Sequence, residues 1–431
     1  MFAERRQKVR AAMGKGAVAI FLGSSMVQRS NDTDFPFRQE SDFWYLTGFD
    51  HPGAVALLRT DGGPEYTLYV EPRDPATEIW TGYRPGVDGA VRDHAADEAH
   101  PRSDFLRHLA DLVGKVDRIH HVLGRNATID ACITGAIEDL RRRSRQGTEA
   151  PTAILDPRAI LHELRLFKSP EELDIMRRAA AISADAHTAA ARLAHPGTYE
   201  YELQAILEYT FRRRGARGPA YTTIVGGGSN ATVLHYVAND SKLTDESLVL
   251  IDAGCELEGY ASDVTRTYPV GGRFTGTGRA LYEVVLSAQL AALDQCRPGH
   301  TLVQVHEAAV RRLAEGLVDL ELLSGDVEEI VSREEHKAYC MHNTSHWLGL
   351  DSHDVGAYRR EGSPRPLEPG MVFTVEPGLY ISESTAQAGS RFRGIGVRIE
   401  DDVVVTEDGH ENLNAALPKT PDELEALVSE R

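Results

Sequence analysis

The chain has 431 residues, of which 42% are hydrophobic and 26% charged, and its formal net charge at pH 7 is −18. This length exceeds what one hydrophobic core normally supports, so we expect two domains. The excess negative charge disfavours nucleic acid and anionic membranes as partners. The sequence contains no run of 18 apolar residues, so no transmembrane helix is predicted.

The first 165 residues alternate helix and strand signals and predict a small αβ domain. A basic N-terminal segment precedes the apolar stretch 17–23, which predicts a first helix followed by a first strand. A signal peptide is disfavoured, because this apolar run is short and no small-residue cleavage site follows it. Further along, the pattern predicts strands at 53–58 and 66–70 and helices at 103–113 and 129–143.

A helix start marks the expected boundary between the domains near residue 165. Ser169, Pro170 and Glu172 have the pattern of a capping box, with serine at the N-cap, proline at the first helical position and glutamate at the third. The helix that follows is expected to run to about Leu193. We therefore assign 1–165 to an N-terminal αβ domain and 166–431 to the second domain.

The second domain repeats its own order of features, which predicts an internal duplication. A helix ends at Pro196-Gly197 and another at Pro298-Gly299, and a further helix follows each pair. Each half then has a histidine-bearing loop, an apolar strand that ends in an acid, and a second strand with a second acid. Two such halves facing each other would bring four acids together about a pseudo-two-fold axis.

Four acids and one histidine in this domain predict a metal site, namely Asp252, Asp263, His346, Glu376 and Glu400. Asp252 and Glu376 each close an apolar strand, where an uncompensated carboxylate is costly. Four carboxylates and one imidazole suit Mn²⁺, with Co²⁺ or Fe²⁺ able to substitute, and can neutralise two divalent ions. A metal-free network of ion pairs would need as many arginines, and only Arg266 and Arg398 are near in the sequence.

At these residues the chain resembles the pita-bread metallopeptidases, and most closely the bacterial Xaa-Pro aminopeptidases (aminopeptidase P). The spacing of eleven between Asp252 and Asp263 matches that family. The motifs are Ile-Asp-Ala-Gly at 251–254, Ser-Asp-Val-Thr-Arg-Thr at 262–267, Ser-His-Trp-Leu-Gly-Leu-Asp at 345–351, Thr-Val-Glu-Pro-Gly at 374–378 and Val-Arg-Ile-Glu-Asp at 397–401, and the likeness extends to 38–49 in the first domain.

This resemblance implies an α/β (α+β) protein with a small N-terminal αβ domain and a pita-bread catalytic domain, the duplicated αβ fold of creatinase and the aminopeptidases. It also implies two divalent ions per chain, with Mn²⁺ favoured over Co²⁺, Fe²⁺ or Zn²⁺. Asp263 and Glu400 would bridge the ions, Asp252 would bind one, and His346 and Glu376 the other. A hydroxide between the ions would be the nucleophile, and Glu376 would pass the proton onward.

Three further histidines acquire roles from the same resemblance. His235, after the glycine triplet 226–228, matches a catalytic-site histidine that faces the substrate. A phosphate-binding loop is disfavoured there, because the P-loop lysine and the G-x-G-x-x-G spacing are both missing. His353 matches a residue that hydrogen-bonds the scissile carbonyl or the oxyanion. His342 matches one that lines the proline subsite.

Arg398, Tyr380 and Trp80 are also expected to contact substrate. Arg398 precedes Glu400 by two residues, so on a strand both side chains would point to one face, and a salt bridge that orients a carboxylate is the alternative role. Tyr380 would help to hold the metal site or the leaving group, or would only pack. Trp80, expected in a polar loop, would reach a neighbouring subunit's active site or anchor its own loop.

The chain is therefore expected to be a metal-dependent aminopeptidase that removes the residue before proline from peptides with proline second. The N-terminal domain would serve substrate access and assembly into a homo-oligomer, a dimer or a tetramer. Four scattered cysteines without a C-x-x-C pair indicate a reducing compartment, so we predict a cytoplasmic location.

Two alternatives remain open on the same scaffold. A prolidase cleaves only X-Pro dipeptides, and a non-catalytic binding protein cleaves nothing. The Ser-His-Trp-Leu-Gly motif and the 24-residue gap from Glu376 to Glu400 favour the aminopeptidase over the prolidase. The presence of all five ligand residues argues against a non-catalytic protein.

Overall fold

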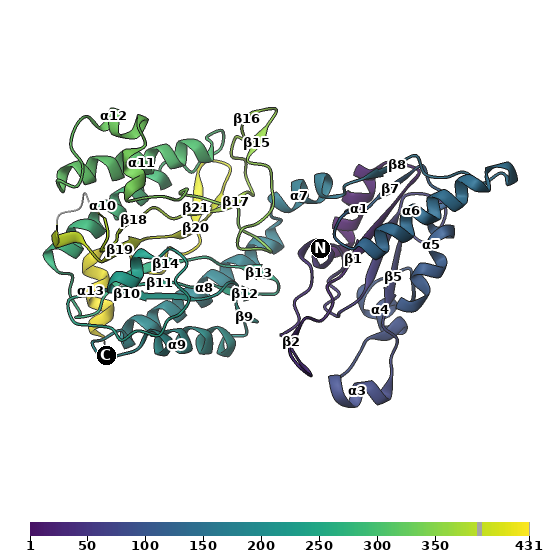
Figure 1. The fold of residues 1–431 in the computed structure, drawn as a ribbon, viewed down its shortest axis with the longest axis horizontal. Coiled ribbons are helices and arrows are strands. Elements are labelled where there is room, and N and C mark those ends of the chain that lie inside the picture. Colours follow the sequence, from purple (N-terminus) through teal and green to yellow (C-terminus); the bar gives the residue numbers. More distant parts are fainter. Residues whose placement is uncertain (386–389, 431) are drawn as a thin grey trace. The chain divides into compact units, whose positions relative to one another are not determined.

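The computed structural model describes residues 1–385 and 390–430, and the chain divides into two compact units, Met1–Leu164 and Arg165–Arg431 (Figure 1). Within these described ranges, no helix is long and apolar enough to cross a membrane.

Unit 1 contains a six-stranded mixed sheet with the strand order β6-β5-β4-β1-β7-β8. Strand β1 pairs antiparallel with β4 and parallel with β7. The strands are β1 (Ala17–Leu22), β4 (Val55–Arg59), β5 (Tyr66–Val70), β6 (Glu98–Pro101), β7 (Arg118–His120) and β8 (Ala153–Leu155), and a separate hairpin joins β2 (Gln28–Ser30) to β3 (Thr33–Asp34).

Two helices, α5 and α6, pack against the sheet and build the main core of unit 1. Alternate residues of β1, Val18 and Ile20, point to one face of the sheet and pack with Phe105 of α5 and Ile133 of α6. The helices of the unit are α1 (Phe2–Met13), α2 (Ser41–Thr47), α3 (Pro75–Thr81), α4 (Gly86–His94), α5 (Phe105–Val113) and α6 (Ala127–Arg142), and α7 (Arg158–Leu166) leads into unit 2.

The first helix that lies wholly in unit 2 is the one that the capping box predicts. The Ser169 hydroxyl accepts from the Glu172 N–H at 3.3 Å, and the Glu172 carboxylate accepts from the Ser169 N–H at 2.9 Å. The first half of the unit comprises α8 (Pro170–Leu193), α9 (Glu200–Arg213), the sheet of β10 (Ile224–Gly227), β11 (Leu248–Asp252) and β14 (Thr265–Pro269), and the sheet of β9 (Gly218–Pro219), β12 (Cys255–Leu257) and β13 (Tyr260–Ala261).

The second half again has two long helices followed by antiparallel strands, the order that the sequence repeat predicts. Its helices are α10 (Gly276–Leu293), α11 (Leu302–Asp319), α12 (Val327–Ser332) and α13 (Pro421–Ser429). Its strands are β15 (Arg359–Arg360), β16 (Ser363–Pro364), β17 (Val372–Val375), β18 (Gly378–Ile381), β19 (Ile395–Arg398), β20 (Asp401–Val405) and β21 (His410–Asn412). The halves meet where the Glu400 N–H donates to the Thr265 carbonyl at 3.1 Å.

Candidate metal centre and active site

A cavity of about 780 Å³ in unit 2 collects most of the predicted site residues. All five expected ligands line it, and so do three expected substrate-facing histidines and one arginine. These residues are Asp252, Asp263, His346, Glu376, Glu400, His235, His342, His353 and Arg398. Trp80 belongs to unit 1 instead, and Tyr380 is buried beside His342 and Arg398.

The acids stand where strands end or break. Asp252 is the last residue of β11, and Glu376 directly follows β17. Asp263 lies between β13 and β14, and Glu400 lies between β19 and β20. The prediction that Arg398 and Glu400 lie on one strand, and therefore share one face of it, is wrong, because β19 ends at Arg398.

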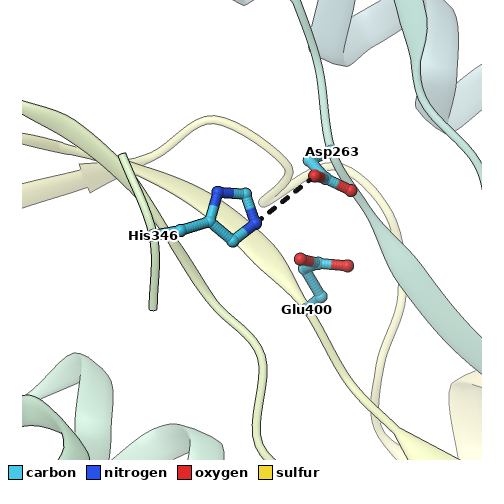
Figure 2. Close-up of side chains that lie close together, drawn as sticks. All are labelled: Asp263, His346 and Glu400. Atoms are coloured by element: carbon cyan, nitrogen blue, oxygen red, sulfur yellow. Dashed lines mark ion pairs between the residues drawn. The ribbon is translucent and has the colours of Figure 1, made fainter. Parts of the chain in front are cut away.

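Three side chains approach one another closely enough to share one cation (Figure 2). Ligand atoms of Asp263, His346 and Glu400 all lie within 4.8 Å of one another. The His346 Nε2 atom is 3.6 Å from Asp263 Oδ2 and 3.5 Å from Glu376 Oε1. Asp252 lines the same cavity, where its carboxylate accepts from Arg398 Nη2 and from the Tyr221 hydroxyl, each at 2.6 Å.

The buried carboxylates of this cluster favour a bound cation. Burial, and then the neighbouring carboxylates, raises the pKa of Asp263 and Glu400 well above the usual range. Burial, with the nearby Asp252, also raises the pKa of Glu376 to about 8. Burial lowers the pKa of His346 to about 4, which keeps the imidazole neutral, as metal ligation requires. The donor set therefore fits divalent metal ions.

Two acids that follow Glu400 hold the cluster in place. Asp402 accepts from the Asp263 N–H and from the Ser262 hydroxyl, both at 3.0 Å, and so fixes the backbone at Asp263. Asp401 is buried on the opposite side, where its carboxylate accepts from Arg266 at 2.6 Å and from Lys419 at 2.7 Å. The two carboxylates thus anchor neighbouring segments to the start of β20.

Sequence reasoning missed these anchors and Tyr221. No sequence pattern indicates a role for either acid after Glu400, although Asp401 ends the motif at 397–401. Tyr221 precedes β10, and β10 pairs with β11 so that Ile224 lies opposite Asp252. Correct strand pairing would have placed Tyr221 near Asp252, but no local motif marks it.

Three of the predicted substrate-facing residues, His342, His353 and Arg398, line the cavity beside the metal ligands, with Tyr380 buried behind them. The His353 ring stands edge-to-face with His346, with ring centroids 4.3 Å apart. The Tyr380 hydroxyl is hydrogen-bonded to His342 Nε2 at 2.8 Å and accepts from Arg398 Nη1 at 2.9 Å. Burial lowers the pKa of His342 to about 4, so its imidazole is neutral where it lines the cavity.

Trp80 is not in a loop and is not buried. It lies in the helix α3, its side chain is 87% exposed, and the neighbouring Ile79 is 81% exposed. The alternative prediction of a loop anchor is therefore wrong, because nothing in unit 1 covers the indole. The helix forms because Asp74 caps it through the Ala76 N–H and Pro75 begins it.

Two family models match this chain. The model of the aminopeptidase P N-terminal domain matches residues 2–120. The model of metallopeptidase family M24 matches residues 174–407, which is more than half of the chain and includes every expected metal ligand. The chain belongs to metallopeptidase family M24. The predicted fold, a small αβ domain followed by a pita-bread domain, is thereby confirmed.

Named relatives of this M24 chain match it over nearly its whole length. The Xaa-Pro aminopeptidase of Escherichia coli is 46% identical over 99% of this chain and 97% of its own. That of Haemophilus influenzae is 41% identical with the same coverage. Among solved structures, Pseudomonas aeruginosa aminopeptidase PepP has a TM-score of 0.97 at 46% identity and covers 99% of this chain and 97% of that one. Zinc-substituted E. coli aminopeptidase P in complex with product has a TM-score of 0.95 at 46% identity and the same coverage.

Proposed function

We propose that this M24 metallopeptidase is an Xaa-Pro aminopeptidase, which releases the first residue of peptides with proline at the second position. The observation that carries the proposal is the cluster of Asp263, His346 and Glu400, whose ligand atoms lie within 4.8 Å of one another in a large cavity. Full-length relatives named for the same activity support it.

We propose that two divalent ions bind per chain, with Mn²⁺ as the favoured ion and Co²⁺, Fe²⁺ or Zn²⁺ as substitutes. The residues that would hold them are Asp252, Asp263, His346, Glu376 and Glu400, with Asp263 and Glu400 shared between the ions. When bound, such ions lower the pKa of water and polarise the scissile carbonyl. Four carboxylates balance the charge of two divalent ions, which supports this number.

The surrounding residues then have separable roles. His353 is exposed to the cavity beside His346, so its imidazole can donate a hydrogen bond to the oxygen of the scissile carbonyl. Glu376 accepts a proton from the attacking water and passes it to the departing proline nitrogen. His342 lines the cavity for the proline ring and is held by the Tyr380 hydroxyl, and Arg398 holds Tyr380 and Asp252 in place.

We propose that the protein is a cytoplasmic homo-oligomer, a dimer or a tetramer, in which unit 1 contributes to assembly and substrate access. The exposed aromatic and aliphatic side chains at α3 support this assembly. Trp80 is 87% exposed, Ile79 is 81% exposed and Tyr83 is 57% exposed, an apolar group that a partner can cover.

The substrate assay separates the candidate activities. Metal-stripped protein restored with Mn²⁺ is expected to cleave X-Pro-Y tripeptides and to release X, with little cleavage of X-Pro dipeptides and none of X-Ala-Y controls. A prolidase would show the reverse order of the two proline substrates. Cleavage of neither would leave a binding protein on this scaffold.

A further inference from the structure

The side chain of Glu200, in the first turn of α9, is fully buried at 0% exposure. Its carboxylate accepts four hydrogen bonds from one segment, residues 227–241. Oε1 accepts from the Gly227 N–H at 2.7 Å and from Asn230 Nδ2 at 2.9 Å. Oε2 accepts from the Tyr236 hydroxyl and the Ser241 N–H, both at 2.9 Å. A buried carboxylate is tolerated only with such partners, so the segment and Glu200 depend on each other.

His235 lies inside this segment, outside any helix or strand, and is exposed to the cavity that it lines. The neighbouring Leu234 lines the same cavity. Leu234 and Tyr236 are half-buried and pack against a core cluster that includes Ala231 and Tyr380. Because Tyr236 is tied to Glu200 through its hydroxyl, the backbone direction at His235 is set from α9.

A second contact from the same helix holds the end of the segment. Asn239 is fully buried, and its amide donates to Gln204 of α9 at 2.9 Å and to the Thr223 carbonyl at 2.8 Å. The Asn239 Oδ1 atom accepts from the Val225 N–H at 3.0 Å. Glu200 and Gln204 are four residues apart, so they lie on one face of α9. That face holds the segment on both sides of His235.

We propose that Glu200 is a positioning residue that holds His235 over the cavity and thereby strengthens peptide binding. This role rests on the proposed function and on the expectation, from the family resemblance, that His235 faces the substrate. The conservative variant Glu200→Gln keeps the size of the side chain but replaces one acceptor oxygen with an NH₂ group. That group faces donors of the segment, so part of the four-bond arrangement is lost and the segment loosens.

The anchor itself is tested by hydrogen exchange on metal-loaded protein. In Glu200→Gln, amide exchange in residues 227–241 is expected to rise by about tenfold or more, the effect of about 1.4 kcal/mol of local opening. The matched control is Glu202→Gln, which makes the same change in the same helix at the residue whose carboxylate caps the Tyr199 N–H. Unchanged exchange in Glu200→Gln, or an equal rise in both variants, would overturn the anchor. This measurement does not depend on whether the protein cleaves X-Pro peptides.

The coupling to His235 is tested by a double-mutant cycle on an X-Pro-Y tripeptide. Glu200→Gln is expected to raise KM by about tenfold with a smaller change in kcat and an unchanged metal content. In a His235→Ala background, the same change is expected to alter KM by less than about twofold, because its effect passes through the missing imidazole. If Glu200→Gln raised KM by the same factor in the wild type and in His235→Ala, Glu200 would not act through His235. Loss of metal in Glu200→Gln would also refute the proposal.

Discussion

Asp263 is the residue on which the candidate metal centre converges. Its carboxylate is 3.6 Å from His346, and Asp402 holds its backbone N–H. Burial and adjacent acids raise the pKa of Asp263, so its charge is stable only beside cations. A carboxylate that is shared between two ions is needed to bind both of them, whereas His346 is expected to bind only one.

This difference predicts unequal metal losses. Asp263→Ala is expected to bind no divalent ion, and His346→Ala to keep about one per chain, because only the first removes a bridge. Elemental analysis after gel filtration measures both, and circular dichroism checks the fold. If the two variants lost the same number of ions, the proposed sharing by Asp263 would be wrong.

His353 provides a test that separates chemistry from metal binding. His353→Ala is expected to keep its metal content and lower kcat by about 10²–10³, the scale for removal of one oxyanion donor. The control is His195→Ala, since His195 is an exposed histidine outside the cavity. A parallel fall in metal content and rate would instead make His353 a ligand or a support for one.

At the scale of elements, sequence patterns predicted the long and buried segments well. The helix α8 begins at its capping box, and β11 ends in Asp252 as expected. The short strands β6 and β8 were missed, because β6 is largely polar, β8 has only three residues, and both are partly exposed. These strands exist through pairing with β5 and β7, a tertiary effect that local sequence does not encode.

His187 connects α8 to Ala253, directly after β11, and to Tyr268 of β14. Its burial predicts that the stability of the fold depends on pH. It is fully buried on α8, with Nε2 at 2.9 Å from the Ala253 carbonyl and Nδ1 at 3.2 Å from the Tyr268 hydroxyl. Burial lowers the pKa of His187 to about 4, against about 6.5 in the unfolded chain. Above pH 6.5 both states are neutral. Between pH 6.5 and 4 only the unfolded chain binds the proton, so acid lowers the stability of the fold.

The expected size of this effect is about 2 kcal/mol of unfolding free energy between pH 7.5 and 5. Urea titrations at the two pH values measure it in the wild type and in His187→Gln, which cannot titrate there. The variant is expected to lose that part of the pH dependence, and His195→Gln is expected to keep it. Identical pH dependences in wild type and His187→Gln would contradict the assignment.

At the scale of the whole molecule, unit 1 presents an apolar group at α3 that its own core does not use. The predicted role of Trp80 in a neighbour's active site stays a prediction. Trp80→Ala is expected to reduce tripeptide turnover while the metals and the fold remain. The role of Trp80 is predicted only by the family resemblance, because a single tryptophan in a polar segment forms no local sequence pattern that indicates a function.

A complementation experiment tests that role directly. Trp80→Ala and Asp263→Ala, co-expressed, are expected to recover about a quarter of wild-type activity if chains pair at random as dimers, since half of the dimers are mixed and each has one complete site. Each variant expressed alone is the control. A monomer in solution, or mixed oligomers without recovery, would mean that Trp80 does not act across subunits.

The central claim is that the carboxylate cluster holds two divalent ions and that the loaded site hydrolyses the Xaa-Pro bond. Its most direct test is a titration of metal-stripped protein with Mn²⁺ while the release of X from an X-Pro-Y tripeptide is followed. The account predicts no activity without metal and a plateau at about two ions per chain. Full hydrolysis without added metal, or a plateau with one ion bound, would contradict it.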